Sequence, residues 1–314
     1  MISASPALRR ATAAGLAVAA GVALAACGSS GSKSSSGNPL NSSAPQGSVV
    51  VGSANFPEDE LLAQIYSTAL AAKGIKVTNK FNIGAREVYY PEVKNGTVTI
   101  MPEYNGALLT TSVDTKSTAA TTDEVDAALR SSLPSTLEIL NPSAAQDKDS
   151  VTVTQAFATA HNLKTIADLK PIAKKVVIGG PPEFKTRTDG LVGLRKNYGL
   201  NFKSFAPLDE SGPITLKALT DGKVQAADVF TTTPQIITDK LVALGDPKFN
   251  FAAQNVVPLV NKKGVNSTIV DTLNAISAKL TTAALLQMDK AVIVDHADYT
   301  TVASGWLKAE GLPN

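Results

Sequence analysis

From Ser48 to about residue 230, short runs of apolar, strand-forming residues alternate with longer segments whose apolar residues recur at helical spacing. In the first unit, residues 48–52 predict a buried strand, Pro57 with the acids behind it predicts a helix start, and Gly74 predicts the helix end. This alternation is typical of an α/β domain with a mainly parallel sheet covered by helices on both faces. The next elements are expected at 75–81 (strand), 87–94 (helix) and 97–101 (strand).

The same scheme repeats in the middle of the chain, where one unit echoes the first region. Tyr104 follows Asn95-Gly96 eight residues after the glycine, and Phe230 follows Asp221-Gly222 at the same distance. Because ligands of open parallel sheets bind outside the carboxyl ends of strands, the echo suggests two lobes presenting aromatic residues to one cleft. It is equally compatible with two ordinary helix–turn–strand units. Strands are expected at 151–154, 176–179, 202–206 and 226–230.

The C-terminal segment from Ser267 carries only helical patterns. We expect it to pack on a lobe that is already built, with Trp306 as a packing residue. The 314 residues suffice for two modest lobes or one large domain.

The N-terminus has the pattern of an export signal over residues 1–26, with Arg9 and Arg10 before an apolar stretch rich in alanine. Small residues then precede Cys27, the only cysteine, and this arrangement resembles the lipobox of bacterial lipoproteins. The resemblance implies acylation of the Cys27 thiol. Residues 28–47 are rich in Ser and Gly and predict a flexible tether between a membrane anchor and an extracytoplasmic body.

The charge balance argues against nucleic acid as a partner. Lys and Arg number 29 and Asp and Glu number 27, and removing the two leader arginines leaves 27 of each sign. A neutral chain without a block of basic residues lacks the electrostatic footprint that nucleic acids or anionic lipid surfaces require.

The usual signatures of enzymes are missing from the sequence. It has two histidines, His161 and His296, with no H-E-x-x-H, no G-x-S-x-G and no phosphate-binding glycine motif. We therefore predict a binding protein with no catalytic residues, no metal and no cofactor.

Four segments carry a family resemblance, in matching order and at matching distances. They read G-S-A-N-F-P-E (52–58), P-E-Y-N-G-A (102–107), E-F-K-T-R-T-D-G (183–190) and A-D-V-F-T-T (227–232). With them, residues 49–312 resemble the osmoprotectant substrate-binding proteins of ATP-binding-cassette (ABC) importers, the glycine betaine, choline and carnitine type.

The resemblance implies an α/β, two-lobed type II periplasmic-binding-protein fold with a ligand cleft between the lobes, and an ABC permease as partner. In that family, aromatic faces attract the quaternary ammonium group of the solute, and a basic residue holds its carboxylate. By motif match, Tyr104 and Phe230 form cage walls, Arg187 clamps an anion and Asn55 offers an amide. An inter-lobe ion pair for Arg187 and a core role for Tyr104 remain alternatives.

The sequence also departs from the family pattern. Ala54 and Ala107 replace hydrogen-bond donors. Asp147, Lys148 and Asp149 lie in the stretch where the family has a cage tyrosine, and Gln254 and Asn255 replace an aromatic pair. Asp149 is interpreted as a cation partner or as a solvated turn acid, and Asn255 as an amide in place of an aromatic residue. These changes leave the solute open.

The sequence therefore predicts a lipoprotein that captures an osmoprotectant such as a quaternary ammonium compound by lobe closure and delivers it to the permease. Lobe I is expected over 48–150 and 256–314, and lobe II over 151–255. The alternatives are the same receptor with a polyol, aromatic or polyamine solute, or a lipoprotein enzyme that uses carboxylates.

Overall fold

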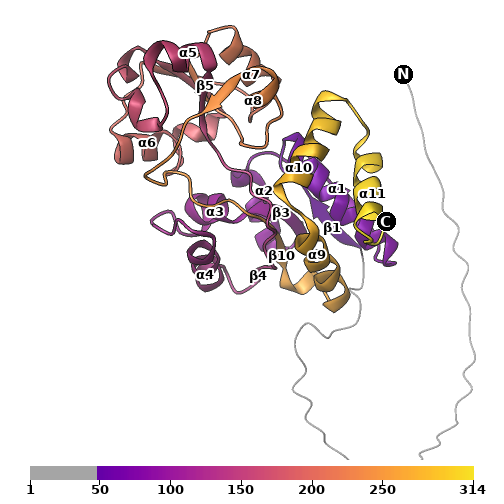
Figure 1. Cartoon of the computed structure of the whole chain (residues 1–314). Helices are drawn as coiled ribbons and strands as arrows, with labels where there is room; N and C mark the ends of the chain where they lie inside the picture. The colour runs from indigo at the N-terminus through magenta and orange to yellow at the C-terminus, as the bar shows by residue number, and fades with distance from the viewer. Residues whose placement is uncertain (1–47) are drawn as a thin grey trace, which may run out of the picture. The chain divides into compact units, whose positions relative to one another are not determined.

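The computed structural model describes residues 48–314, so the predicted signal peptide, Cys27 and the tether lie outside the described residues. The described part contains two five-stranded sheets (Figure 1). The first sheet has the order β2-β1-β3-β10-β4, with β1 (Val49–Gly52), β2 (Val77–Lys80), β3 (Ile100–Tyr104), β4 (Leu137–Ile139) and β10 (Val256–Asn261). The second has the order β7-β6-β8-β5-β9, with β5 (Val151–Thr154), β6 (Val177–Gly180), β7 (Ser204–Pro207), β8 (Ala226–Asp228) and β9 (Leu241–Ala243).

Each sheet is mixed and contains one antiparallel strand. In the first sheet β10 runs antiparallel to both of its neighbours, and in the second sheet β5 does the same. The sequence patterns predict seven of these strands, including the antiparallel β5, but not β4, β9 or β10. Strands β4 and β9 have only three residues each, and β10 has Pro258 in its middle, where proline is rare in central strands. Pro258 faces Pro102 across the ladder, and its carbonyl accepts a hydrogen bond from the Leu140 N–H at 2.9 Å.

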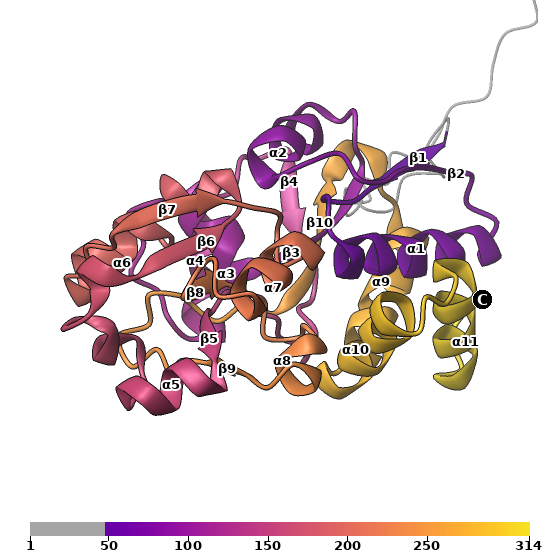
Figure 2. The ribbon, with the colours of Figure 1, turned by 90° about the horizontal axis from the view of Figure 1, so that it is seen from above.

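Helices α1 (Pro57–Ala72) and α2 (Arg86–Asn95) cover opposite faces of the first sheet (Figure 2). This follows from right-handed crossovers, because the chain moves outward from β1 to β2 and then reverses direction to reach β3. Helix α1 begins at Pro57 with three acids in its first turn and ends before Gly74, whose φ is 77°, as the sequence predicts.

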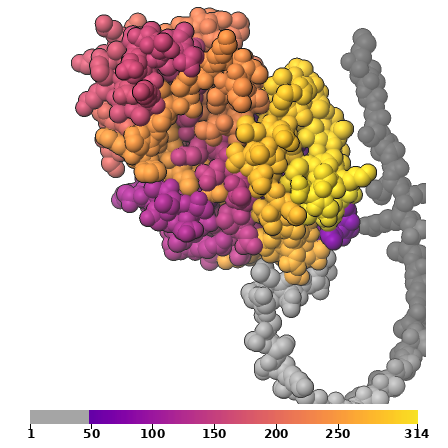
Figure 3. Space-filling view, in the orientation of Figure 1, coloured from indigo at the N-terminus to yellow at the C-terminus, as the bar shows by residue number. Residues whose placement is uncertain are grey.

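The helical C-terminal segment packs against α1, as expected. It comprises α9 (Ser267–Lys279), α10 (Thr282–Asp289), the π-turn η6 (Lys290–Val294) and α11 (Tyr299–Ala309). Figure 3 shows this yellow segment forming a continuous surface on its side of the molecule. Trp306 packs against the core of the first sheet.

The remaining helical segments connect the strands. In the first region they are α3 (Asn105–Leu108), η1 (Leu109–Val113), α4 (Thr122–Ser132) and, after β10, η5 (Lys262–Gly264). In the second region they are α5 (Gln155–His161), η2 (Ile166–Leu169), η3 (Ala173–Lys175), η4 (Pro182–Lys185), α6 (Leu191–Tyr198), α7 (Pro213–Thr220) and α8 (Gln235–Thr238).

Separate hydrophobic cores surround the two sheets, one cluster for the first and two for the second. The chain passes between the sheets twice, from β4 to β5 and from β9 to β10. Across residues 48–314, no single helix has the length and hydropathy to span a membrane, although α9 and the segment Thr282–Val294, bent by 91°, pass that test as a pair.

Candidate ligand-binding cleft

Side chains from both sheets line one cleft, and they lie at or just beyond the carboxyl ends of parallel strands. Phe56 follows β1, Tyr104 ends β3, Arg187 follows β6, Glu210 follows β7 and Phe230 follows β8. These are the positions at which open α/β sheets bind ligands. The space among them is about 20 Å³, roughly room for one water molecule. The cleft is therefore closed among these side chains, and the two sides must separate to admit a solute between the rings.

Three aromatic rings meet in the cleft. The Phe56 ring centroid lies 5.9 Å from that of Tyr104 and 5.0 Å from that of Phe230. Phe56 is 7% exposed, and the Tyr104 hydroxyl donates to Glu58 Oε1 at 2.5 Å. The structure thus brings Tyr104 and Phe230 from the two echoed units into one cleft, with Phe56 between them.

On the side of the first sheet, the acid at the end of β3 is fully paired. Glu103 accepts from Arg86 Nε at 3.0 Å and Nη2 at 3.1 Å, from the Tyr89 hydroxyl at 2.9 Å and from the Tyr104 N–H at 3.0 Å. Burial alone would lower the pKa of Arg86, but the charge and hydrogen bonds of Glu103 hold that pKa above its ordinary value. The carboxyl oxygens of Glu103 thus all have hydrogen-bond partners, and its charge is neutralised by Arg86.

On the side of the second sheet, the acids have few partners. Asp228 is 2% exposed, its Oδ1 has no hydrogen-bond partner within residues 48–314, and burial raises its pKa. Burial also raises the pKa of Glu210 to about 7. Burial and then the charge of Asp149 raise the pKa of Asp189 to about 6, and Asp189 accepts from Thr110 Oγ1 at 2.9 Å. Removing these carboxylates from water therefore disfavours their charged forms.

Arg187 lines the cleft and also joins its two sides. Its Nε and Nη2 donate to the two Glu87 carboxylate oxygens, each at 3.0 Å, and Glu87 belongs to α2 beside the first sheet. Burial would raise the pKa of Glu87, but the hydrogen bond and charge of Arg187 lower it. In this closed structure Arg187 forms the inter-lobe ion pair that the sequence left as an alternative to an anion clamp.

The two connecting segments form the base of the cleft. They pair in an antiparallel bridge between Gln146 and Asn255. Asp147 Oδ1 accepts from the Thr232 N–H at 3.1 Å, and Asp149 Oδ2 accepts from Gln254 Nε2 at 2.9 Å. Asp147, Asp149 and Gln254 all line the cleft.

Asn255 and Asn55 lie outside this group of cleft residues. The Asn255 side chain donates to the Ser143 carbonyl at 2.9 Å and accepts from Thr122 Oγ1 at 2.8 Å, so its amide joins segments of the protein. Asn55 is exposed before α1. Gly106 is required nearby, since an added Cβ would lie only 2.2 Å from the Ala253 carbonyl oxygen.

Of the sequence-predicted ligand residues, Tyr104, Asp149, Arg187 and Phe230 line the cleft. Six further residues line it. Three of them were identified only as departures from the family pattern (Ala107, Asp147 and Gln254), and three were not predicted as site residues (Phe56, Arg86 and Glu210). The sequence did carry one signal, because Phe56 belongs to the segment 52–58 that supports the family resemblance.

Comparison with known proteins identifies the family. The model of the substrate-binding domain of ABC-type glycine betaine transport systems matches residues 47–309. The chain belongs to this family. Its members are extracytoplasmic binding components, so a small solute and a membrane permease are its partners.

Similar proteins support this assignment. The glycine betaine-binding protein YehZ of Escherichia coli (strain K12) is 26% identical over 288 residues, which cover 84% of this chain and 90% of that protein. The ergothioneine transport permease/ergothioneine binding protein EgtU of Helicobacter pylori (strain G27) is 23% identical over 84% of this chain and 48% of that protein. The crystal structure of a glycine betaine/carnitine/choline ABC transporter protein superposes with a TM-score of 0.64 at 19% identity, covering 84% of this chain and 98% of that chain. That match shows the same two-lobed fold and confirms the predicted fold class.

Proposed function

We propose that this protein captures a small solute carrying a permanently positive ammonium group, such as choline or glycine betaine, and presents it to an ABC permease. The observation that carries the proposal is the aromatic group of Phe56, Tyr104 and Phe230 at the meeting point of the two sheets. A quaternary ammonium group has no N–H to donate, and ring faces attract it electrostatically.

The charges around these rings favour a cation. Both cleft arginines are already paired, Arg86 with Glu103 and Arg187 with Glu87. Three further carboxyl groups line the cleft without a salt bridge to any described Lys or Arg: Asp147, Asp149 and Glu210. A positive solute would stabilise the ionised forms of these carboxyl groups and offset their charge.

Capture would proceed by closure of two lobes, residues 48–150 with 256–314 and residues 151–255. Contacts that only a closed protein can make support this motion. Thr188 Oγ1 donates to the Thr110 carbonyl at 2.7 Å, and the Arg187–Glu87 pair joins the same two sides. A solute that bridges the lobes would shift the population toward a closed state in which the rings lie further apart than in this structure, and the permease would recognise that state.

The proposal includes a lipid anchor at Cys27 and no catalytic role. The lipobox-like sequence supports the anchor, and the transport relatives support binding without turnover. Two acyl chains give stable membrane attachment, so Cys27→Ser should release the body from membranes. Failure of wild-type protein to incorporate a fatty-acid probe would contradict the anchor.

Isothermal titration of the soluble body with choline, glycine betaine and carnitine tests the solute class, with sorbitol and spermidine as representatives of the alternatives. We expect binding in the micromolar range or tighter, roughly −8 kcal/mol, for at least one quaternary ammonium compound. Tight binding of sorbitol or spermidine, with none of the quaternary compounds bound, would overturn the proposal. Product analysis after incubation would reveal any turnover.

A further inference from the structure

A second and larger cavity adjoins the cleft. It has a volume of about 500 Å³ and shares Phe56, Phe230 and Glu210 with the cleft lining. Its walls come from both lobes, with α7 on one side and the end of α10 with η6 on the other. A volume of this size is typical of sites for small organic molecules.

Much of the wall is apolar. Leu216 of α7 faces the cavity from one lobe, and Val292 and Ile293 of η6 face it from the other. Pro57 and Pro213, at the starts of α1 and α7, complete this surface. The cavity therefore suits a hydrocarbon chain.

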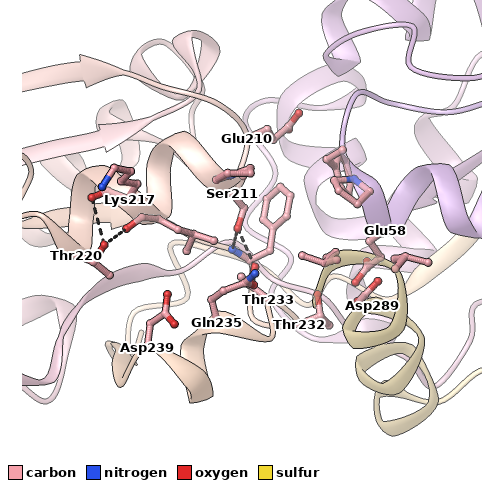
Figure 4. A pocket seen from close by; sticks show the side chains of 18 of the residues that line it. Glu58, Glu210, Ser211, Lys217, Thr220, Thr232, Thr233, Gln235, Asp239 and Asp289 are labelled. Atoms are coloured by element: carbon pink, nitrogen blue, oxygen red, sulfur yellow. Dashed lines mark hydrogen bonds between the residues drawn. The ribbon is translucent and has the colours of Figure 1, made fainter. Parts of the chain in front are cut away.

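Two buried carboxyl groups interrupt the apolar wall (Figure 4). Asp289 is 1% exposed and neither of its oxygens has a hydrogen-bond partner in the described part of the chain; Glu58 is 3% exposed and its Oε2 likewise has none. Figure 4 shows both side chains together on one side of the cavity, with Lys217 and Thr220 on the other. Burial, the nearby charge of Glu58 and, once one of the two groups is protonated, a hydrogen bond with the Glu58 carboxyl group raise the pKa of Asp289. In the absence of a cation the two carboxyl groups therefore share a proton, and neither has a partner of opposite charge.

Buried polar atoms without partners are costly, and proteins seldom leave several together. Lys217, which also lines the cavity, bonds to Asp221 instead, with Nζ and Oδ1 3.2 Å apart. A metal ion does not account for the pair, because residues 48–314 contain no cluster of three or more His, Cys, Asp or Glu able to hold one. An organic cation that donates hydrogen bonds would supply a partner of opposite charge.

We propose that this cavity is a second subsite, in which Glu58 and Asp289 bind the primary ammonium end of an elongated cation whose hydrocarbon body lies along Leu216 and η6. A primary ammonium group donates three hydrogen bonds, and once the proton shared by the pair is displaced, Glu58 Oε2 and both Asp289 oxygens have no other partner among the described residues. The inference rests on the proposed function only for the other end of the solute, a quaternary ammonium group placed among Phe56, Tyr104 and Phe230.

Three probes test the subsite by isothermal titration. (6-Aminohexyl)trimethylammonium carries both ends, hexyltrimethylammonium lacks the primary ammonium group, and hexane-1,6-diamine lacks the quaternary group. We expect the first probe to bind at least tenfold more tightly than the second. Glycine betaine or choline serves as a ligand too short to use the cavity.

Asp289→Asn is the matched variant, because it keeps the side-chain shape and removes the charge. It should abolish the difference between the first two probes and leave the affinity for choline within twofold. Leu216→Phe, from the opposite wall, should weaken both hexyl compounds by filling the cavity. A circular dichroism spectrum and melting curve check the fold of each variant.

Each remaining outcome is decisive. Equal binding of the first two probes by the wild type, or an unchanged difference in Asp289→Asn, would overturn the subsite. Binding of choline with no binding of either hexyl probe would overturn the subsite and leave the proposed function standing. Binding of hexane-1,6-diamine that Asp289→Asn weakens, without binding of any quaternary compound, would support the subsite and overturn the proposed function.

Discussion

Strands β3 and β8 hold the same place in their sheets, each between a parallel neighbour and the antiparallel strand, and each ends near an acid and an aromatic residue. The two acids differ sharply in their surroundings. Glu103 at the end of β3 is bound by Arg86, Tyr89 and a backbone N–H. Asp228 at the end of β8 has an oxygen with no partner in the described residues and a raised pKa caused by burial.

This difference separates the ends of two equivalent strands. The acid at the end of β3 is neutralised by an arginine of its own lobe. Beyond β7 and at the end of β8, Glu210 and Asp228 have no salt bridge to a described Lys or Arg, and burial raises the pKa of both. A cation that enters between the lobes would supply the positive charge that these two carboxyl groups lack. The charge of the ligand and the closure of the lobes are therefore coupled.

The largest expected effect concerns the buried Arg86–Glu103 ion pair. Arg86→Met leaves Glu103 fully buried without its cation, and breaking a buried pair in this way costs about 3–5 kcal/mol in the free energy of unfolding. Urea denaturation measures it. Asp228→Asn is the matched change at the end of β8 and should leave the free energy of unfolding unchanged or raise it. Equal destabilisation by the two variants would abolish the comparison.

The second effect is a pH dependence of closure without ligand. Burial raises the pKa of Glu210 from its ordinary value of 4.5 to about 7 in the closed structure. Opening that returns Glu210 to water would lower this pKa, so the closed form binds the proton more tightly. Closure is then unopposed by Glu210 below pH 4.5 and becomes progressively less favourable between pH 4.5 and 7. The ligand-free radius of gyration should increase from pH 5 to pH 8 in small-angle scattering. Most of that increase should vanish in Glu210→Gln, and a radius that ignores pH in the wild type would refute this account.

The third effect tests the ring at the end of β3. Tyr104→Ala removes an aromatic wall and should weaken choline binding at least tenfold, since a desolvated cation–π contact contributes about 2 kcal/mol. Tyr104→Phe keeps the ring and removes only the hydroxyl bonded to Glu58, so it should retain most of the affinity. Titration calorimetry gives both values. Wild-type affinity in Tyr104→Ala would show that the site lies elsewhere.

The smallest effect concerns the pair that joins the lobes. Glu87 has a half-exposed side chain, and such ion pairs contribute about 0–1 kcal/mol. Arg187→Met and Glu87→Gln should therefore weaken choline binding about equally and no more than fivefold. A larger loss of affinity for glycine betaine than for choline, in Arg187→Met alone, would show that Arg187 also contacts the ligand carboxylate. A loss above twentyfold for choline in both variants would contradict the weak pairing described here.

The architecture was readable from local patterns. Pro57 and Gly74 mark the ends of α1, and Gly96 ends α2 with a φ of 86°, because each satisfies a backbone requirement set by its immediate neighbours. Strand β10 was not predicted, because Pro258 in its middle is a local signal against a central strand. The pairing of Pro258 with Pro102 of β3 depends on the fold, which local patterns do not give.

The site was less predictable, because its chemistry depends on partners distant in sequence. Arg86 and Glu103 are 17 residues apart, and Arg187 and Glu87 are 100 apart, so no spacing rule pairs them. Tyr104 and Phe230 were accessible through the family resemblance. Both Asp289 oxygens and Glu210 Oε2 are buried without a hydrogen-bond donor among the described residues. The sequence does not specify burial at single positions, so this could not be predicted.

The central claim is that the closed cleft demands positive charge, and titration of the wild-type body with choline and with its neutral carbon isostere, 3,3-dimethylbutan-1-ol, tests it most directly. The two molecules have nearly the same shape and the same hydroxyl group. If the rings and the unpaired carboxyl groups recognise a cation, choline binds at least tenfold more tightly, a difference of about 1.4 kcal/mol or more. Equal affinities for the two molecules would contradict the account.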